Sequence, residues 1–257
     1  MFLLTLFTMV LAQEPQENQE KPPFRYNLSV GGMWIAGNLN QMQFNTSGLI
    51  TYDKNYMGND LLINGYRIYM KPQGVDDFIR IGDDLSITTI PFYYFHPNVY
   101  GFGIGHWSTS LLHRIDSRVF AGGGFGYAPI RRPDFLVRAG FGAFYEQTEF
   151  PEESFNIDIE HDGSTRSIAR VGLISNGWFQ PKDSPVSLRY FGRFLINPMA
   201  PEDYRFTIDG SSKWHIYGPF SLRLGIRYAA SSVVVEGVET FDLRSSFGIA
   251  FSNRNGK

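Results

Sequence analysis

Apolar and polar side chains alternate along the chain with a period of two from Arg25 onward, which is the pattern of β-strands. In the stretch FSLRLGIRYA, Phe, Leu, Leu, Ile and Tyr share one face, while Ser, Arg, Gly, Arg and Ala share the other. The stretch FDLRSSFGIAF alternates in the same manner. Clusters of Gly, Pro, Asn and Asp separate such segments, so we expect antiparallel strands joined by turns and loops.

The length of the segments favours a membrane barrel over a soluble sandwich, in which strands also alternate. Soluble strands typically have about 5–6 residues, whereas a tilted strand needs about 9–11 residues to cross a bilayer, and the segments here reach the greater length. Aromatic residues, 16% of the chain, gather at segment ends, where membrane barrels carry interfacial girdles. The apolar faces of the last two segments are therefore expected to contact lipid; they comprise Phe220, Leu222, Leu224, Ile226, Phe241, Leu243, Phe247 and Ile249.

We predict an all-β fold, an antiparallel up-and-down transmembrane β-barrel of about twelve strands over residues 25–253. The strands are expected to begin near residues 26, 40, 61, 76, 98, 114, 134, 165, 186, 203, 219 and 239. If the barrel starts on the periplasmic side, the connections after even strands should be short. PKDSP and GP fit this rule, while the longest connection, FPEESFNIDIEHDGS, follows the seventh strand and is expected outside the cell.

The amino-terminal residues resemble a secretory signal. Residues 1–12, MFLLTLFTMVLA, are apolar and end in small residues, and polar residues follow at once. The stretch is too short to span a membrane, which takes about 20 residues; a buried helix is the alternative. Residues 13–24 are polar and contain proline, so we expect a flexible periplasmic segment. The predicted location is the outer membrane of a Gram-negative bacterium.

Composition excludes several functions. The chain has no cysteine, so disulfides and thiolate metal sites are absent, and its net charge of −2 gives no electrostatic reason to bind nucleic acid. The acidic stretch from Glu146 to Asp162 lacks the spacing of an EF-hand, so we assign no metal and no cofactor. The expected partners are outer-membrane lipid, lipopolysaccharide and the barrel-assembly machinery, and the expected state is a monomer.

The predicted inner faces carry many charges. They comprise Arg118, Arg138, Arg189, Arg193, Arg205, Arg223, Arg227, Arg244, Asp116, Glu146, Asp209 and Asp242. An arginine-rich lining could form a pore that favours anions. A paired network could instead fill a narrow lumen, since charges removed from water must be paired or hydrated. Barrels of about 8 strands are filled by side chains and those of about 16 are open, and we favour the filled lumen.

The stretch GFGIGHWSTS contains a candidate pair for catalysis, His106 and Ser108, on the same face as Phe102 and Ile104. If that face contacts lipid, the pair lies outside the barrel near one rim, where lipid A deacylases and phospholipases of the outer membrane hold a Ser–His pair. Such chemistry also needs a carboxylate to orient the histidine, and none lies between Asp84 and Asp116. We therefore predict no enzyme activity and keep a lipid hydrolase as the alternative.

Several stretches resemble the salt-induced outer-membrane proteins, a bacterial barrel family of unknown function. They are WIAGNLNQMQF, RIDSRVFAGGGFGY, PEDYRFTIDGSSKW, FSLRLGIRY and VEGVETFDLRSSFGIAF. The resemblance covers most of the chain after residue 24 and rests on strand pattern and on a few Gly, Asn and Asp positions. It implies an outer-membrane barrel without an assigned catalytic motif, so we expect a structural role or a narrow solute path, as in porin-like proteins.

Overall fold

A computed structural model of the protein describes residues 24–35, 40–72, 77–151, 164–182 and 184–253. The predicted signal peptide over residues 1–12 lies outside these ranges, as does the predicted flexible segment except for its last residue. Within the described ranges the chain forms twelve strands. No helix in this part of the chain has the length and apolar character required to cross a membrane.

The strands contain 12 to 18 residues, so each is long enough to cross a bilayer at a tilt. They are β1 (Phe24–Ile35), β2 (Asn40–Lys54), β3 (Met57–Lys71), β4 (Ile79–His96), β5 (Val99–Ser110), β6 (Ile115–Arg131), β7 (Phe135–Glu149), β8 (Thr165–Phe179), β9 (Val186–Asn197), β10 (Ala200–Tyr217), β11 (Phe220–Ser231) and β12 (Phe241–Ser252). The predicted strand count is confirmed, and the largest offset is at β3, which begins at Met57 and not near residue 61.

The sheet closes on itself, because β1 pairs with β2 on one side and with β12 on the other. Every strand is antiparallel to both neighbours in a simple up-and-down order, which confirms the predicted fold. We call one end of the barrel the turn end, where two-residue turns at 55–56, 97–98 and 218–219 join the strands. The other end, with the connections 150–164 and 232–240, is the loop end.

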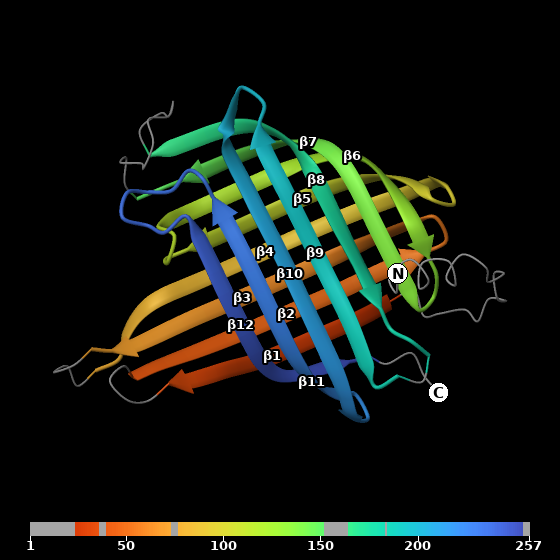
Figure 1. The fold of residues 1–257 in the computed structure, drawn as a ribbon, viewed down its shortest axis with the longest axis horizontal. Helices are drawn as coiled ribbons and strands as arrows, with labels where there is room; N and C mark the ends of the chain where they lie inside the picture. The colour runs from red at the N-terminus through yellow and green to blue at the C-terminus, as the bar shows by residue number, and fades with distance from the viewer. Residues whose placement is uncertain (1–23, 36–39, 73–76, 152–163, 183, 254–257) are drawn as a thin grey trace, which may run out of the picture.

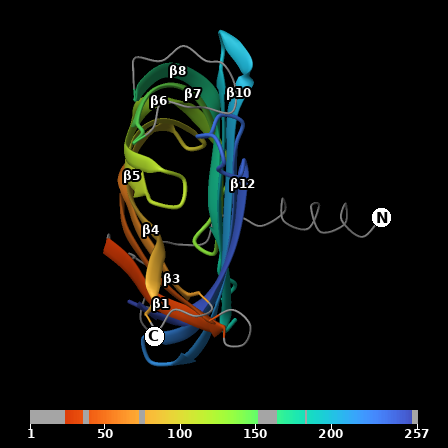
Figure 2. The same ribbon diagram turned by 90° about the vertical axis from the view of Figure 1, so that its left-hand side faces the viewer.

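The barrel is flattened, with two walls whose strands cross when viewed through the molecule (Figure 1). A view turned by 90° shows β3 to β6 along one wall and β10 and β12 along the other (Figure 2). The flattening brings side chains from opposite walls within contact distance, and it therefore determines what occupies the lumen.

The outer surface carries a broad band of exposed apolar side chains. On β12, Phe241, Leu243, Phe247 and Ile249 are 56–67% exposed, and β11 adds Phe220, Leu224 and Ile226 at 38–55%. Leu222 lies on the same face of β11 and is partly exposed. An apolar surface of this extent is unfavourable in water, whereas closure leaves no backbone edge unpaired, as a membrane requires. The exterior is therefore that of a membrane barrel.

The inner surface holds an aromatic cluster toward the turn end, built mainly from β4 to β7. Tyr94, Tyr100, Phe102 and Phe120 are each at most 8% exposed and belong to one contiguous apolar cluster. Glycine makes room for these rings: a Cβ built on Gly126 would lie 2.3 Å from the ring of Tyr100. The lumen is therefore filled at this level by side chains from its own wall.

Candidate functional site: a charged cluster inside the barrel

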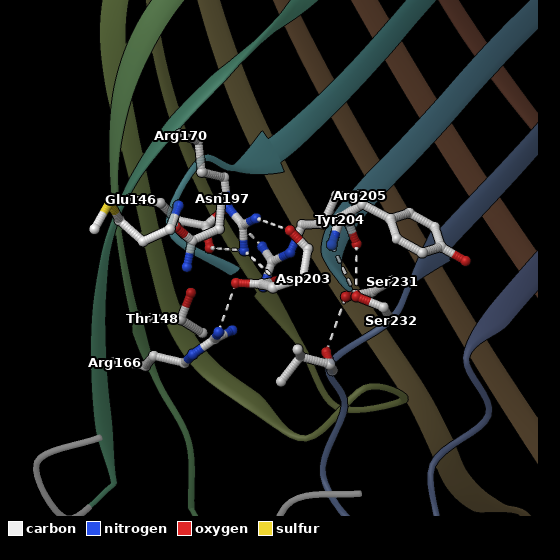
Figure 3. Close-up of polar contacts among 12 residues, drawn as sticks. Glu146, Thr148, Arg166, Arg170, Asn197, Asp203, Tyr204, Arg205, Ser231 and Ser232 are labelled. Carbon is white, nitrogen blue, oxygen red and sulfur yellow. Dashed lines mark hydrogen bonds and ion pairs between the residues drawn. The ribbon is translucent and has the colours of Figure 1, made fainter. Parts of the chain in front are cut away.

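The interior near the loop end holds a cluster of charged side chains from three strands, β7, β8 and β10 (Figure 3). On β7 and β8 the inward positions are those with even numbers, and this alternation turns Glu146, Arg166 and Arg170 into the lumen. On β10 it turns Asp203 and Arg205 inward. All five residues are at most 6% exposed, so these charges are buried within the protein.

Asp203 is the first acidic centre of the cluster and is 1% exposed. Arg166 donates from Nη2 to its Oδ2 at 2.6 Å, and Arg170 donates from Nη2 to its Oδ1 at 3.0 Å. Arg170 also donates from Nη1 to the Asp203 carbonyl at 3.2 Å. Two guanidinium groups thus hold one carboxylate in a fixed position.

Glu146 is the second acidic centre. Arg205 Nη1 donates to its Oε2 at 2.7 Å, and Arg170 Nη2 lies 3.5 Å from its Oε1. Arg170 therefore joins both carboxylates into one network. Breaking a buried pair by removing one partner typically costs about 3–5 kcal/mol, so the network fixes β7, β8 and β10 relative to one another.

Two further arginines lie beside this network. Arg118 on β6 donates from Nε to Thr148 at 3.1 Å, and the Arg193 guanidinium on β9 lies 5.3 Å from the ring centre of Phe120. Both are close enough to act electrostatically on Glu146. The cluster thus contains more guanidinium groups than carboxylates.

A separate set of ion pairs crosses the lumen. Arg244 on β12 lies 2.6 Å from Asp84 on β4 and also pairs with Asp242. His113, in the turn between β5 and β6, lies 3.6 Å from Asp242. The pair of Arg244 with Asp84 connects opposite walls, because four steps around the barrel separate β4 from β12.

Two more contacts cross the lumen toward the turn end. Arg138 on β7 lies 3.6 Å from Asp60 on β3 and donates to the Tyr94 hydroxyl at 2.8 Å. The Arg25 guanidinium on β1 lies 5.5 Å from the ring centre of Trp178 on β8. The two walls are therefore connected at several levels along the barrel.

The remaining residues predicted for the lumen differ in their surroundings. Arg189 and Arg223 lie on the inward faces of β9 and β11, and Asp209 lies 3.9 Å from Arg227 in a half-exposed pair. Asp116 departs from the prediction, since it is exposed at the start of β6. The register between β5 and β6 shifts at this point, so that its neighbour Ile115 is buried instead.

The hypothesis that His106 and Ser108 lie on the lipid-facing side of the barrel is wrong. Phe102 and Ile104, on the same face, are buried inside the barrel. His106 pairs in register with Phe120 and hydrogen-bonds through Nδ1 to the Thr88 hydroxyl at 2.7 Å. Its hydrogen-bond partner is thus a threonine on β4, and the arrangement does not form a nucleophile and base facing lipid.

Sequence reasoning missed three members of the cluster: Arg166, Arg170 and Asp203. The signal was present in TRSIARVG, where Arg166, Ile168 and Arg170 share one strand face. Asp203 precedes Arg205 by two residues and shares its face, but it lies at the predicted start of the strand, and the predicted inner face does not include it.

The acidic stretch beginning at Glu146 divides between two environments. Glu146 is buried in the ion-pair network, Glu149 is exposed at the end of β7, and the acidic residues from 152 to 162 lie outside the described ranges. Within the described part of the chain, no group of three or more His, Asp or Glu side chains is arranged to hold a metal ion.

A closed barrel with a lipid-exposed exterior and a charged interior defines the class of outer-membrane β-barrel proteins. A family model described as protein of unknown function, DUF481, matches residues 29–252, and the chain belongs to this family. None of the curated proteins compared with the chain matches it.

Solved structures with a similar fold include a translocator domain, a porin and an outer membrane channel. The translocator domain of the autotransporter NalP from Neisseria meningitidis has 10% identity and a TM-score of 0.44, covering 97% of this chain and 93% of that one. The NanC porin has 6% identity and a TM-score of 0.47, covering 89% and 100%. The COG4313 outer membrane channel from Pseudomonas putida F1 has 11% identity and a TM-score of 0.46, covering 93% and 100%.

Proposed function

We propose that the protein is a monomeric barrel of the bacterial outer membrane with a structural role, and that its lumen is closed to solutes by its own side chains. The observation that carries this proposal is the set of contacts between opposite walls: Arg244 with Asp84, Arg138 with Asp60, and Arg25 with Trp178. An open channel requires a water-filled lumen, whereas these contacts occupy it.

The aromatic cluster supports the same proposal. Tyr94 and Tyr100 have ring centres 5.3 Å apart, and Phe120 and Phe144 have ring centres 4.9 Å apart, which are distances of direct packing. Arg138 lies against this cluster, with its guanidinium carbon 3.8 Å from the ring centre of Phe92. A hydrated ion would have to displace packed rings to pass this level.

Conductance in a planar lipid bilayer tests the closed lumen. The purified, folded chain is expected to give no reproducible channel steps, while the double variant R138A/F102A, which removes a cross-lumen contact and a neighbouring ring, should give more current. Regular steps from the unaltered chain would refute the closed lumen. They would favour the second candidate, a narrow path for anions, for which the arginine-rich interior is the supporting observation.

Location and partners are tested separately. Fractionation should recover the chain with outer-membrane lipid and lipopolysaccharide, and an unboiled sample should migrate faster on a gel than a boiled one. Depletion of the barrel-assembly machinery should reduce the folded form. Induction by salt, which the resemblance to salt-induced outer-membrane proteins suggests, is tested by comparing the amount of protein after growth at low and high NaCl.

A further inference from the structure

The charged cluster near the loop end has more positive than negative charge. Its five guanidinium groups, from Arg118, Arg166, Arg170, Arg193 and Arg205, face the two carboxylates of Glu146 and Asp203, so three positive charges are not matched. Buried charges are costly unless they are paired. An excess of one sign in a buried cluster therefore favours a ligand of the opposite sign.

Several N–H groups of the cluster are buried and have no hydrogen-bond partner among the described residues. They are Nε and Nη1 of Arg166, Nε and Nη2 of Arg205, Nε of Arg170 and Nε of Arg193. The side chains of Arg166 and Arg205 are only 5% and 8% exposed. Because nearly all buried polar groups in proteins are hydrogen-bonded, these donors indicate a site for an acceptor.

We propose that this cluster is a binding site for a phosphate group, carried by free phosphate or by a small phosphate monoester. Guanidinium forks donate two parallel hydrogen bonds to phosphate oxygens. A carboxylate would neutralise one of the three excess charges, whereas phosphate brings up to two and has more acceptor oxygens. The proposal is independent of whether the lumen conducts.

The position of the cluster favours a dissolved ligand over a lipid headgroup. Its side chains project into the lumen, away from the lipid-facing surface. The connection between β11 and β12 lies over it: Ser232 exchanges hydrogen bonds with Tyr204, which lies between Asp203 and Arg205, and Val235 is fully buried against Ile115 and Phe150. Exclusion of bulk water beneath this connection strengthens binding of an anion.

Titration calorimetry with sodium phosphate tests the site, using the full chain folded in a detergent without phosphate groups and at constant ionic strength. The expected result is saturable binding of one phosphate and a rise in the thermal unfolding midpoint with phosphate concentration. R193Q is the informative variant, because Arg193 has no carboxylate within ion-pair distance in the described chain. We expect R193Q to bind phosphate with a Kd at least about tenfold higher than that of the parent chain. Without phosphate, its thermal unfolding midpoint should be equal to or above that of the parent.

Two further variants complete the test. R205K keeps a positive charge beside Glu146 but loses the planar guanidinium group and its parallel N–H donors. It should therefore also weaken phosphate binding. R223Q removes an inward-facing arginine of β11, outside the cluster, and should bind phosphate as the parent does. No binding to the parent, equal affinity for chloride, or undiminished binding to R193Q would overturn the proposal. Binding of lipid A phosphates without binding of free phosphate would overturn it as well.

Discussion

Arg244 on β12 and Asp84 on β4 form an ion pair across the lumen, with 2.6 Å between Nη1 and Oδ2. Asp84 also accepts a hydrogen bond from the Ser110 hydroxyl on β5 at 2.6 Å. Both charged side chains are about 85% removed from solvent, with 14% and 16% exposure. One pair thus connects a strand of each wall and is only weakly screened by water.

Replacement of Arg244 by glutamine should lower the free energy of unfolding by about 2 kcal/mol, the cost of losing a charged hydrogen bond in a partly buried site. A urea titration of the chain folded in lipid vesicles measures the change. R67Q is the matched control, because the Arg67 pair with Asp83 is half exposed and should contribute much less to stability. Equal losses in the two variants would contradict the importance of the cross-lumen pair.

Replacement of Gly126 by alanine should destabilise the barrel by about 1–3 kcal/mol, since the added methyl group overpacks against the buried ring of Tyr100. G210A serves as the control, because no atom lies within 4 Å of a Cβ at that position. The double variant Y100A/G126A should lose less stability than the sum of the single variants, as expected for residues in contact. Additive losses in the same urea titration would show that the ring does not require the glycine.

A lysine in place of Ile226, near the middle of β11 and 55% exposed on the outer face, should reduce the folding free energy in vesicles by about 2–4 kcal/mol. The same change at Phe220, the first residue of β11, should cost at most about 1 kcal/mol, because the lysine reaches the interface there. Equal losses of folding free energy in the two variants would contradict a bilayer midplane near the middle of β11.

Neither the parent chain nor S108A should release acyl chains from lipid A or phospholipid vesicles. His106 is hydrogen-bonded to Thr88 inside the barrel, so a lipid ester at the outer surface does not reach it. Gas chromatography of released fatty acids measures the activity, with a known lipase as positive control. Release by the parent that is lost in S108A would contradict this prediction.

The strand pattern was predictable because the outer face of a membrane barrel is apolar along its whole length. On β11 and β12 the inner face is polar, so the alternation also indicates which face is which. The connections after even strands were correctly expected to be short, since turn residues such as Gly218 adopt backbone conformations that few other residues reach (φ = 54°).

The inner and outer faces of β5 could not be told apart in the same way. Phe102 and Ile104 face inward, while Gly101 and Gly103 occupy outer positions, so both faces lack a polar signature over this stretch. The contacts of the charged cluster were also not predictable, because Glu146, Arg170 and Arg205 meet only through the register of four successive strands. Local alternation gives a face for each residue but not its partners.

The alternation of glycine and ring between β5 and β6 has a consequence for the size of the barrel. Tyr100 lies opposite Gly126 and Phe102 lies opposite Gly124, so each large group on one strand meets the smallest possible group on the next. A shift of one residue in the register of β5 against β6 would turn the rings outward. A shift of two residues would leave the ring at one end of β5 opposite the wrong residue of β6. Strand stagger and diameter are coupled in closed barrels, and the complementarity of this single pair of strands therefore helps to specify the circumference of the whole molecule.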